Sequence, residues 1–244
     1  MVASQVHLVR HGEVFNPDGI LYGRLPGFGL SKLGHRMAHA AADELAERSR
    51  PISALRVSPL QRTRESAAPI AATFGLDPVI DERIIEPTNR FEGTRMKLAV
   101  RKPVYWPYLI NPLRPSWGEA YASIEQRMLA AVHDAFDSVD SGDVVLVSHQ
   151  LPIWVSHLSV AGERYAHDPR KRRCALSSIT TFERRAAEIP AAAADGPSDE
   201  SAAHPGEAAP VHPGRTPEAQ RLIEVGYVEP AASLLVTATD VGAV

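Results

Sequence analysis

Val6-His7-Leu8-Val9-Arg10-His11-Gly12-Glu13 is the stretch of sequence that decides the fold of this chain. Its apolar first half predicts a short buried strand over residues 6–9, and the Arg-His-Gly turn follows directly. In open α/β sheets, ligands bind beyond the carboxyl ends of the strands. Histidine is a competent nucleophile toward phosphorus, and the planar fork of arginine matches phosphate oxygens. The stretch therefore predicts a phosphate-handling site at the end of a central strand.

Strands and helices alternate along most of the chain. Apolar runs predict further strands over residues 52–57, 79–80, 144–147, 178–182 and 222–228. Helices are predicted over residues 31–48, 119–139 and 151–160, with Ser31 as an N-cap, and another is predicted to start at Ser58-Pro59 with Ser58 as its N-cap. This order predicts an α/β fold with three α/β/α layers around a mostly parallel sheet.

Composition excludes several classes of protein. The chain has 244 residues, 44% of them hydrophobic, which is enough for a full core, and a net charge of −3. That charge offers no general attraction for nucleic acid or for an anionic membrane, and no apolar run approaches the ~20 residues of a membrane span. A single cysteine, Cys174, excludes an internal disulfide and a thiolate-rich metal site. With a strand starting by about residue 5, there is no room for a signal peptide, and we predict a cytoplasmic protein. The oligomeric state is left open.

One stretch differs in composition from the rest. Residues 186–217 are rich in Ala, Pro, Gly and acidic residues and carry almost no large apolar side chain, so we predict a disordered insert there. Because strands are predicted on both sides of it, residues 1–244 are predicted to form a single domain. Residues 87–117, between Glu86 and Gly118, contain the aromatic residues Trp106, Tyr108 and Trp117.

The candidate catalytic residues all follow predicted strands. Arg10 and His11 end the first strand, Arg62 lies in the first turn of the helix after the second strand, Glu86 follows the third, and His149 ends the strand over 144–147. A transferring phosphoryl group spreads negative charge over its oxygens, so fixed positive groups must surround it. A carboxyl group suits protonation of the leaving oxygen. This set needs no metal, and we predict neither metal nor other cofactor.

The motifs resemble those of the histidine phosphatase superfamily, in the branch that contains cofactor-dependent phosphoglycerate mutases and broad phosphatases. They occur in the order typical of that family and span about residues 6–182. The resemblance rests on Arg10-His11-Gly12, the Ser-x-Leu-x-Arg segment 58–62 and Ser148-His149, with support from Asn16, Leu30-Ser31, Gly34 and Gly118-Glu119.

The resemblance implies a role for each matched residue. His11 is expected to carry the phosphoryl group, and Glu86 to act as the proton donor. The expected partner is a small phosphorylated substrate. The resemblance implies that the phosphoryl oxygens are bound by Arg10, Arg62 and His149, and that His149 is also catalytic. Asn16 is implied to be a secondary residue of the pocket.

Three positions depart from the family pattern. Val14 stands where a hydroxyl residue is common, and Gln150 follows His149 where glycine is usual, with bulk that narrows the pocket. Pro87 restricts the backbone beside Glu86 and is expected to shift its carboxylate. These departures bear on the choice of substrate.

We expect a metal-independent phosphatase of small phosphomonoesters that acts through a phosphohistidine. The resemblance implies that residues 87–117 cap the active site, where Trp106, Tyr108 and Trp117 fit a leaving-group pocket and a cap core equally well. The main alternative is a phosphoglycerate mutase, which the several basic residues of this cap segment do not exclude. The other branch of the superfamily, with acid phosphatases and phytases, is disfavoured because it follows the second histidine with Asp, and Gln150 stands here. A non-catalytic phosphate-binding module is the third alternative.

Two further patterns have a plain interpretation beside a functional one. His35 and His39 have the spacing of metal ligands on a helix, although a solvated helix face explains them better. The basic run 168–173 is typical of a solvated loop, and contact with an acidic substrate is its alternative interpretation.

Overall fold

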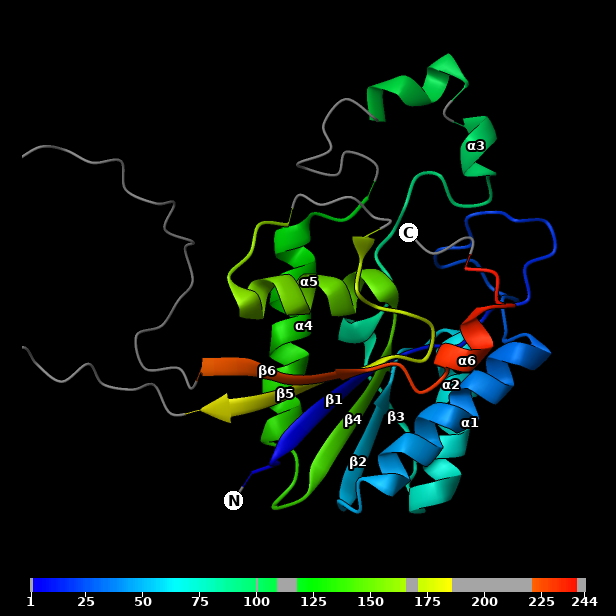
Figure 1. Ribbon diagram of the computed structural model, residues 1–244. Helices are drawn as coiled ribbons and strands as arrows, with labels where there is room; N and C mark the ends of the chain where they lie inside the picture. The colour runs from blue at the N-terminus through cyan, green and yellow to red at the C-terminus, as the bar shows by residue number, and fades with distance from the viewer. Residues whose placement is uncertain (1, 100, 109–117, 166–170, 186–220, 241–244) are drawn as a thin grey trace, which may run out of the picture.

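A mixed sheet forms the centre of the molecule. The computed structural model describes residues 2–99, 101–108, 118–165, 171–185 and 221–240. Within these ranges the sheet has six strands in the order β3-β2-β4-β1-β5-β6 (Figure 1). The pairs β1/β4, β2/β4 and β2/β3 are parallel, whereas β5 runs antiparallel to β1 and to β6. The strands are β1 (Gln5–Arg10), β2 (Ile52–Val57), β3 (Val79–Ile80), β4 (Asp143–Ser148), β5 (Ile179–Arg185) and β6 (Arg221–Val228).

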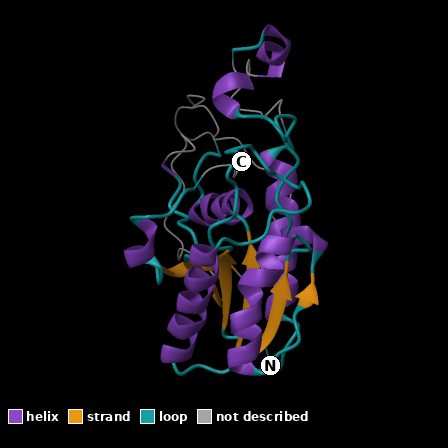
Figure 2. Ribbon diagram, turned by 90° about the vertical axis from the view of Figure 1, so that its right-hand side faces the viewer, coloured by secondary structure: helices purple, strands orange, loops and turns teal. Residues whose placement is uncertain are grey.

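Helices cover both faces of the sheet (Figure 2). On one face lie α1 (Lys32–Glu47) and α2 (Gln61–Phe74), and on the other lie α4 (Tyr121–Phe136) and α5 (Gln150–Ala161). The predicted three-layer α/β/α fold with a mostly parallel sheet is therefore confirmed. The shorter elements are η1 (Glu82–Ile84), α3 (Met96–Ala99), η2 (Pro103–Tyr108) and α6 (Ala232–Leu235).

The central strand β4 contributes to two cores. Val144 and Leu146 pack in the cluster beneath α4 and α5, whereas Val145 and Val147 pack in the cluster beneath α1 and α2. Successive side chains of a strand point to opposite faces, so a strand covered on both sides must be apolar throughout. This requirement explains the continuous Val-Val-Leu-Val run.

Of the two predicted helix N-caps, one is confirmed and the other is wrong. Ser31 caps α1 as predicted, because its hydroxyl accepts a hydrogen bond from the Gly34 N–H at 2.9 Å. The prediction for Ser58 is wrong, since α2 begins at Gln61 with Leu60 as its N-cap. The Ser58 hydroxyl is instead bonded to the ring of His149. The helix predicted over 119–139 is shorter at both ends, at Tyr121–Phe136.

The predicted cap is described in part. Its helices α3 and η2 lie far from the sheet, beyond the end at which the parallel strands finish (Figure 1). Trp106 in η2 is exposed, which argues against a place in a buried cap core. Trp117 and the predicted disordered insert 186–217 lie outside the described residues, so the insert and the single-domain organisation stay predictions. None of the helices in the described ranges is long and apolar enough to cross a membrane.

Candidate active site

The five principal residues predicted for the site meet at one end of the sheet. Arg10 and His149 lie at the carboxyl ends of the adjacent parallel strands β1 and β4, and His11 follows Arg10. Arg62 lies in the first turn of α2, and Glu86 follows η1. All five are at most 2% exposed. Buried charged groups need partners or a function, so this cluster is the candidate active site.

His11 is held as a neutral imidazole. Its Nδ1 lies 2.7 Å from the Gly12 carbonyl oxygen, which only accepts hydrogen bonds, so Nδ1 carries the proton and Nε2 keeps its lone pair. Burial, followed by the charges of Arg62 and Arg10, holds the pKa of His11 well below its ordinary value. An unprotonated Nε2 in a positive environment is suited to attack on an anionic phosphoryl group.

His149 is held beside it by Ser58. The Ser58 hydroxyl lies 2.7 Å from His149 Nε2, which leaves Nδ1 facing Glu86 at 3.6 Å from Oε2. The rings of His11 and His149 lie edge to face, with centroids 5.3 Å apart. The orienting role of Ser58 was missed by the sequence analysis, which assigned its hydroxyl to a helix N-terminus.

Glu86 is a carboxyl that titrates near neutrality. Burial raises its pKa to about 7, although the positive charges of Arg62, Arg172 and Arg10 act in the opposite direction. Arg24 fixes its backbone by donating from Nε to the Glu86 carbonyl oxygen. The carboxylate stays beside His149 despite Pro87, so the expected shift does not take it out of the cluster. Such a group can both give and accept a proton at neutral pH.

Four polar atoms of the cluster make no hydrogen bond within the described residues. They are Arg10 Nε, Arg62 Nε, Glu86 Oε1 and His149 Nδ1, and all four are buried. A buried polar atom without a partner costs stability, so such atoms rarely gather in one place without a function. Guanidinium donors, an imidazole nitrogen and a protonatable carboxyl together match a phosphate ester in charge and in hydrogen bonding.

Arg62 is oriented by a residue that the sequence analysis missed. Its Nη2 donates to the Gly23 carbonyl oxygen at 2.8 Å, and its guanidinium lies 4.8 Å from the centre of the Tyr22 ring. Tyr22 is 2% exposed, and burial raises its pKa to about 12. It therefore stays a neutral aromatic surface beside the arginine. Nothing in the Gly- and Pro-rich loop around Tyr22 signals this role.

Gln150 brings one member of the basic run to the site. Its Oε1 accepts a hydrogen bond from Arg172 Nη1 at 3.2 Å. Arg172 is half-buried and its charge acts on Glu86. The departure at Gln150 therefore positions a further cation, and for Arg172 the interpretation as a plain solvated residue is wrong.

The remaining predicted residues have local contacts or are exposed. Asn16 closes its own loop, donating to the Ile20 carbonyl oxygen at 2.8 Å and accepting from the Ile20 N–H at 3.2 Å, so its role in the pocket stays a prediction. Val14 is buried and pairs with Leu30. His35 and His39 are exposed on α1, as a solvated helix face requires. Across the described ranges, no three His, Cys, Asp or Glu side chains are grouped so that they could hold a metal ion.

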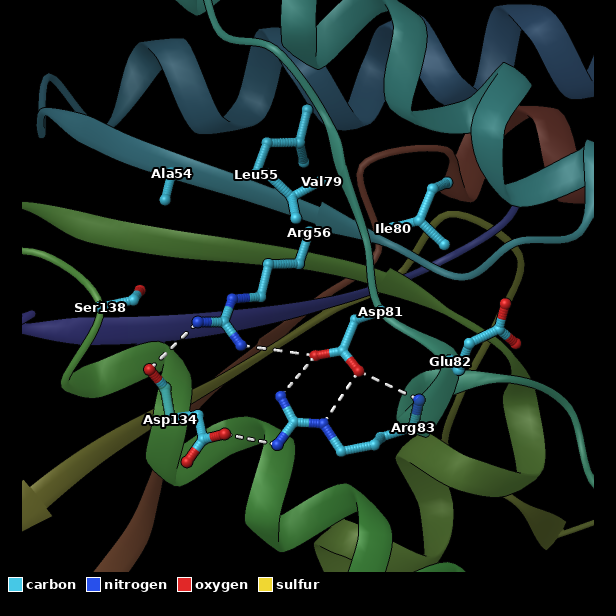
Figure 3. Close-up of a pocket in the computed structure, with 10 residues that line it drawn as sticks. All are labelled: Ala54, Leu55, Arg56, Val79, Ile80, Asp81, Glu82, Arg83, Asp134 and Ser138. Carbon is cyan, nitrogen blue, oxygen red and sulfur yellow. Dashed lines mark hydrogen bonds and ion pairs between the residues drawn. The ribbon is translucent and has the colours of Figure 1, made fainter.

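A shallow hollow lies elsewhere, against β2 and β3, with a volume of about 660 Å³ (Figure 3). Its charged side chains pair with one another: Asp81 accepts from Arg83 and Arg56, and Arg83 also pairs with Asp134. The hollow shares no residue with the cluster at the strand ends, and its charged side chains other than Glu82 already have partners. We therefore place the chemistry at the cluster and not in this hollow.

Comparison with known proteins identifies the family of this chain. Residues 6–192 match the histidine phosphatase superfamily (branch 1). The chain is 52% identical over 182 residues to the uncharacterised protein Rv0525 of Mycobacterium tuberculosis, covering 73% of this chain and 89% of that protein. It is 31% identical over 183 residues to a probable phosphoglycerate mutase, GpmB, of Yersinia enterocolitica, covering 72% and 84%.

Solved structures share the fold. A mycobacterial glucosyl-3-phosphoglycerate phosphatase superposes with a TM-score of 0.61 at 23% identity, covering 74% of this chain and 90% of that one. A phosphoserine phosphatase of Entamoeba histolytica superposes with a TM-score of 0.60 at 21% identity, covering 73% and 89%. The match over residues 6–192 shows that this chain belongs to branch 1 of the histidine phosphatase superfamily.

Proposed function

We propose that this protein is a metal-independent phosphatase that hydrolyses small phosphomonoesters through a phosphohistidine at His11. The observation that carries the proposal is the set of four buried polar atoms, on Arg10, Arg62, Glu86 and His149, that have no hydrogen-bond partner among the described residues. They surround a histidine whose burial and neighbouring guanidinium groups favour the neutral, nucleophilic ring.

In the first step, His11 Nε2 attacks phosphorus and the ester P–O bond breaks. Arg10, Arg62 and His149 stabilise the negative charge on the phosphoryl oxygens. The leaving alkoxide takes the proton of Glu86, and an alcohol departs. Preorganised donors suit this task because they need no rearrangement as the charge develops.

In the second step, the Glu86 carboxylate takes a proton from water as the water oxygen attacks phosphorus. The P–N bond breaks, inorganic phosphate leaves, and His11 recovers its free ring nitrogen. Glu86 is again protonated, so the cycle closes without a further acid. A pKa of about 7 suits a group that must first give a proton and then accept one.

A phosphoglycerate mutase is the second candidate, favoured by the 31% identity to a probable phosphoglycerate mutase. In that reaction, the phosphohistidine returns its phosphoryl group to another hydroxyl of the substrate instead of to water. The two activities share the first step and differ in the acceptor.

The test is release of inorganic phosphate from a panel of phosphomonoesters in the presence of EDTA. The panel contains 3-phosphoglycerate, phosphoserine, sugar phosphates, nucleotides and p-nitrophenyl phosphate. His11→Ala serves as the matched inactive variant, because it removes the ring nitrogen that attacks phosphorus in the proposed mechanism. We expect EDTA-resistant release that His11→Ala abolishes.

Three other outcomes would contradict the proposal of a phosphatase that acts through His11. Residual turnover above a few per cent in His11→Ala would mean that the nucleophile is misassigned. Isomerised phosphoglycerate in the presence of a bisphosphate primer, without phosphate release, would favour the mutase. Binding of phosphate without either activity would favour a non-catalytic phosphate-binding module.

A further inference from the structure

The chain after β6 returns to the catalytic cluster. α6 lies beside α1 (Figure 1), where Leu234 and Leu235 pack against a cluster that includes Met37. Beyond α6, the Thr239 N–H donates to Glu13 Oε1 at 2.6 Å. Apolar packing and this hydrogen bond together place the next residue, Asp240, beside the Arg-His-Gly turn.

Asp240 forms a two-pronged ion pair with Arg10. Its Oδ2 lies 2.9 Å from Nη1 and its Oδ1 lies 2.6 Å from Nη2, so the carboxylate meets the outer end of the guanidinium group. Nη1 also donates to the Cys174 carbonyl oxygen at 2.7 Å. Arg10 is fully buried, whereas the Asp240 side chain is 40% exposed, so the carboxylate approaches from the solvent side.

A count of N–H groups shows what this pairing leaves for a ligand. A guanidinium group has five N–H donors, of which Nη1 provides two and Nη2 provides two. Asp240 and Cys174 take both donors of Nη1, and Asp240 takes one of Nη2. The donors that remain are the Nε–H and the second Nη2–H, which share the side edge of the group. Arg10 Nε is one of the four buried atoms of the cluster without a partner.

We infer that Asp240 is a positioning residue, which holds Arg10 by its outer end so that the Nε–Nη2 edge faces the phosphoryl group at His11. This inference rests on the proposed function. The alternative is that the Asp240 carboxylate occupies the place of the phosphate and inhibits the enzyme. A carboxylate in that place would contact Arg62 Nε and His149 Nδ1, yet neither atom has a hydrogen-bond partner in the described part of the chain.

The test compares Asp240→Asn with the wild-type protein, using the full chain. Asparagine keeps the shape and removes the charge, so Arg10 is held less firmly. We expect the dissociation constant of inorganic phosphate, measured by titration calorimetry, to rise about tenfold, and Asp240→Ala to raise it at least as much. The KM for p-nitrophenyl phosphate rises in parallel, with a smaller effect on kcat. Asp77→Asn, at an exposed aspartate, is the matched control and leaves both unchanged.

A positioning role and an inhibitory role of Asp240 predict opposite changes in phosphate affinity for Asp240→Asn. Phosphate binding that is tighter, unchanged or less than about fivefold weaker in Asp240→Asn would overturn the inference, and tighter binding would show an inhibitory carboxylate. A melting temperature equal to that of the wild type verifies that Asp240→Asn is folded, and Asp240→Glu, which keeps the charge, should recover part of the affinity. If the wild type binds phosphate without turnover, the phosphatase proposal fails, but the ratio of phosphate affinities still decides the role of Asp240.

Discussion

Arg62 contributes a positive charge from the first turn of α2, where burial lowers its pKa and Gly23 and Tyr22 hold it in place. Because the charge is already oriented, its loss affects the transition state more than the ground state. We predict that Arg62→Ala lowers kcat by roughly 10²-fold or more, by comparison with removal of one preorganised stabilising donor. Steady-state kinetics measures the effect, with Arg64→Ala on the same helix as the control. A change below about threefold would place Arg62 outside the chemistry.

In the proposed mechanism, the pH dependence of activity depends on Glu86. The general acid of the first step must be protonated, and burial raises the pKa of Glu86 to about 7. His11 must be neutral to act as the nucleophile. Its pKa is lowered well below the ordinary value of 6.5, so the ring stays neutral across the pH range of this limb. We therefore predict that kcat/KM falls as pH rises through about 7, and that Glu86→Gln removes this alkaline limb along with most of the activity. A pH profile that is flat from 6 to 9 in the wild type would contradict the assignment.

Arg172 allows an independent test of the alkaline limb that Glu86 gives to the pH profile of kcat/KM. Its positive charge lowers the pKa of Glu86, in opposition to burial. We predict that Arg172→Ala raises the pKa of Glu86 and moves the alkaline limb of the kcat/KM profile to higher pH. Lys171→Ala, at an exposed neighbour, is the control and leaves the limb in place. A limb that moves to lower pH would exclude an electrostatic link between Arg172 and Glu86.

At the scale of elements, the turn after β1 is pressed against the start of α1. A Cβ atom added to Gly34 would lie 2.0 Å from the Glu13 carbonyl oxygen, and one added to Gly12 would lie 2.4 Å from the Gly34 oxygen. Neither backbone can move without shifting the loop that carries His11. Glycine at these positions therefore allows the helix and the catalytic turn to touch.

We predict that Gly34→Ala destabilises the fold by about 1–3 kcal/mol, the usual cost of overpacking, and also lowers kcat because the His11 turn is displaced. Gly226→Ala in β6 is the matched control, because its added Cβ would lie 3.8 Å from Thr181 in ordinary contact. Urea unfolding and turnover test both effects. If Gly34→Ala and the wild type had the same free energy of unfolding, a Cβ atom at this position would not clash with the Glu13 carbonyl oxygen.

At the scale of the whole molecule, an ion-pair network lies at the end of the sheet opposite to the candidate active site. Asp143 starts β4, and its buried carboxylate accepts from Arg50 at 2.6 and 2.8 Å and lies 3.3 Å from the His7 ring. Burial raises the pKa of Asp143, but Arg50 and His7 outweigh burial and lower it to about 2. The network joins β1, β4 and the loop before β2 at the end of the sheet opposite to the catalytic cluster.

We predict that Asp143→Asn lowers the free energy of unfolding by about 2 kcal/mol at pH 7, with no change in KM. The folded-state pKa of Asp143 lies below its ordinary value of 3.8, so the stability it adds is present above pH 3.8 and is lost as pH falls toward 2. The difference between wild type and variant should therefore shrink in acid. A difference that is independent of pH would exclude ionisation of Asp143 as its source.

The sequence by itself determined the sheet, the layers and the main residues on which the proposed mechanism rests. Strand periodicity and the Val144–Val147 run are local signals, and the matched motifs lie within a few residues of strand ends, so Arg10, His11 and His149 could be read without coordinates. The direction of parallel strands then requires their carboxyl ends to meet. These features depend on short stretches of chain, where side-chain pattern and backbone geometry are tightly linked.

Only the tertiary structure decided how those groups are held. Ser58 reaches His149 across 91 positions of sequence, and Asp240 reaches Arg10 across 230. Such contacts depend on which surfaces pack together, and no local pattern encodes them. Ser58 shows the limit most clearly: a serine before a proline is a good helix N-cap by local propensity, yet the neighbouring strand offers its hydroxyl an imidazole partner. The raised pKa of Glu86 has the same origin, because burial is a property of the folded chain as a whole.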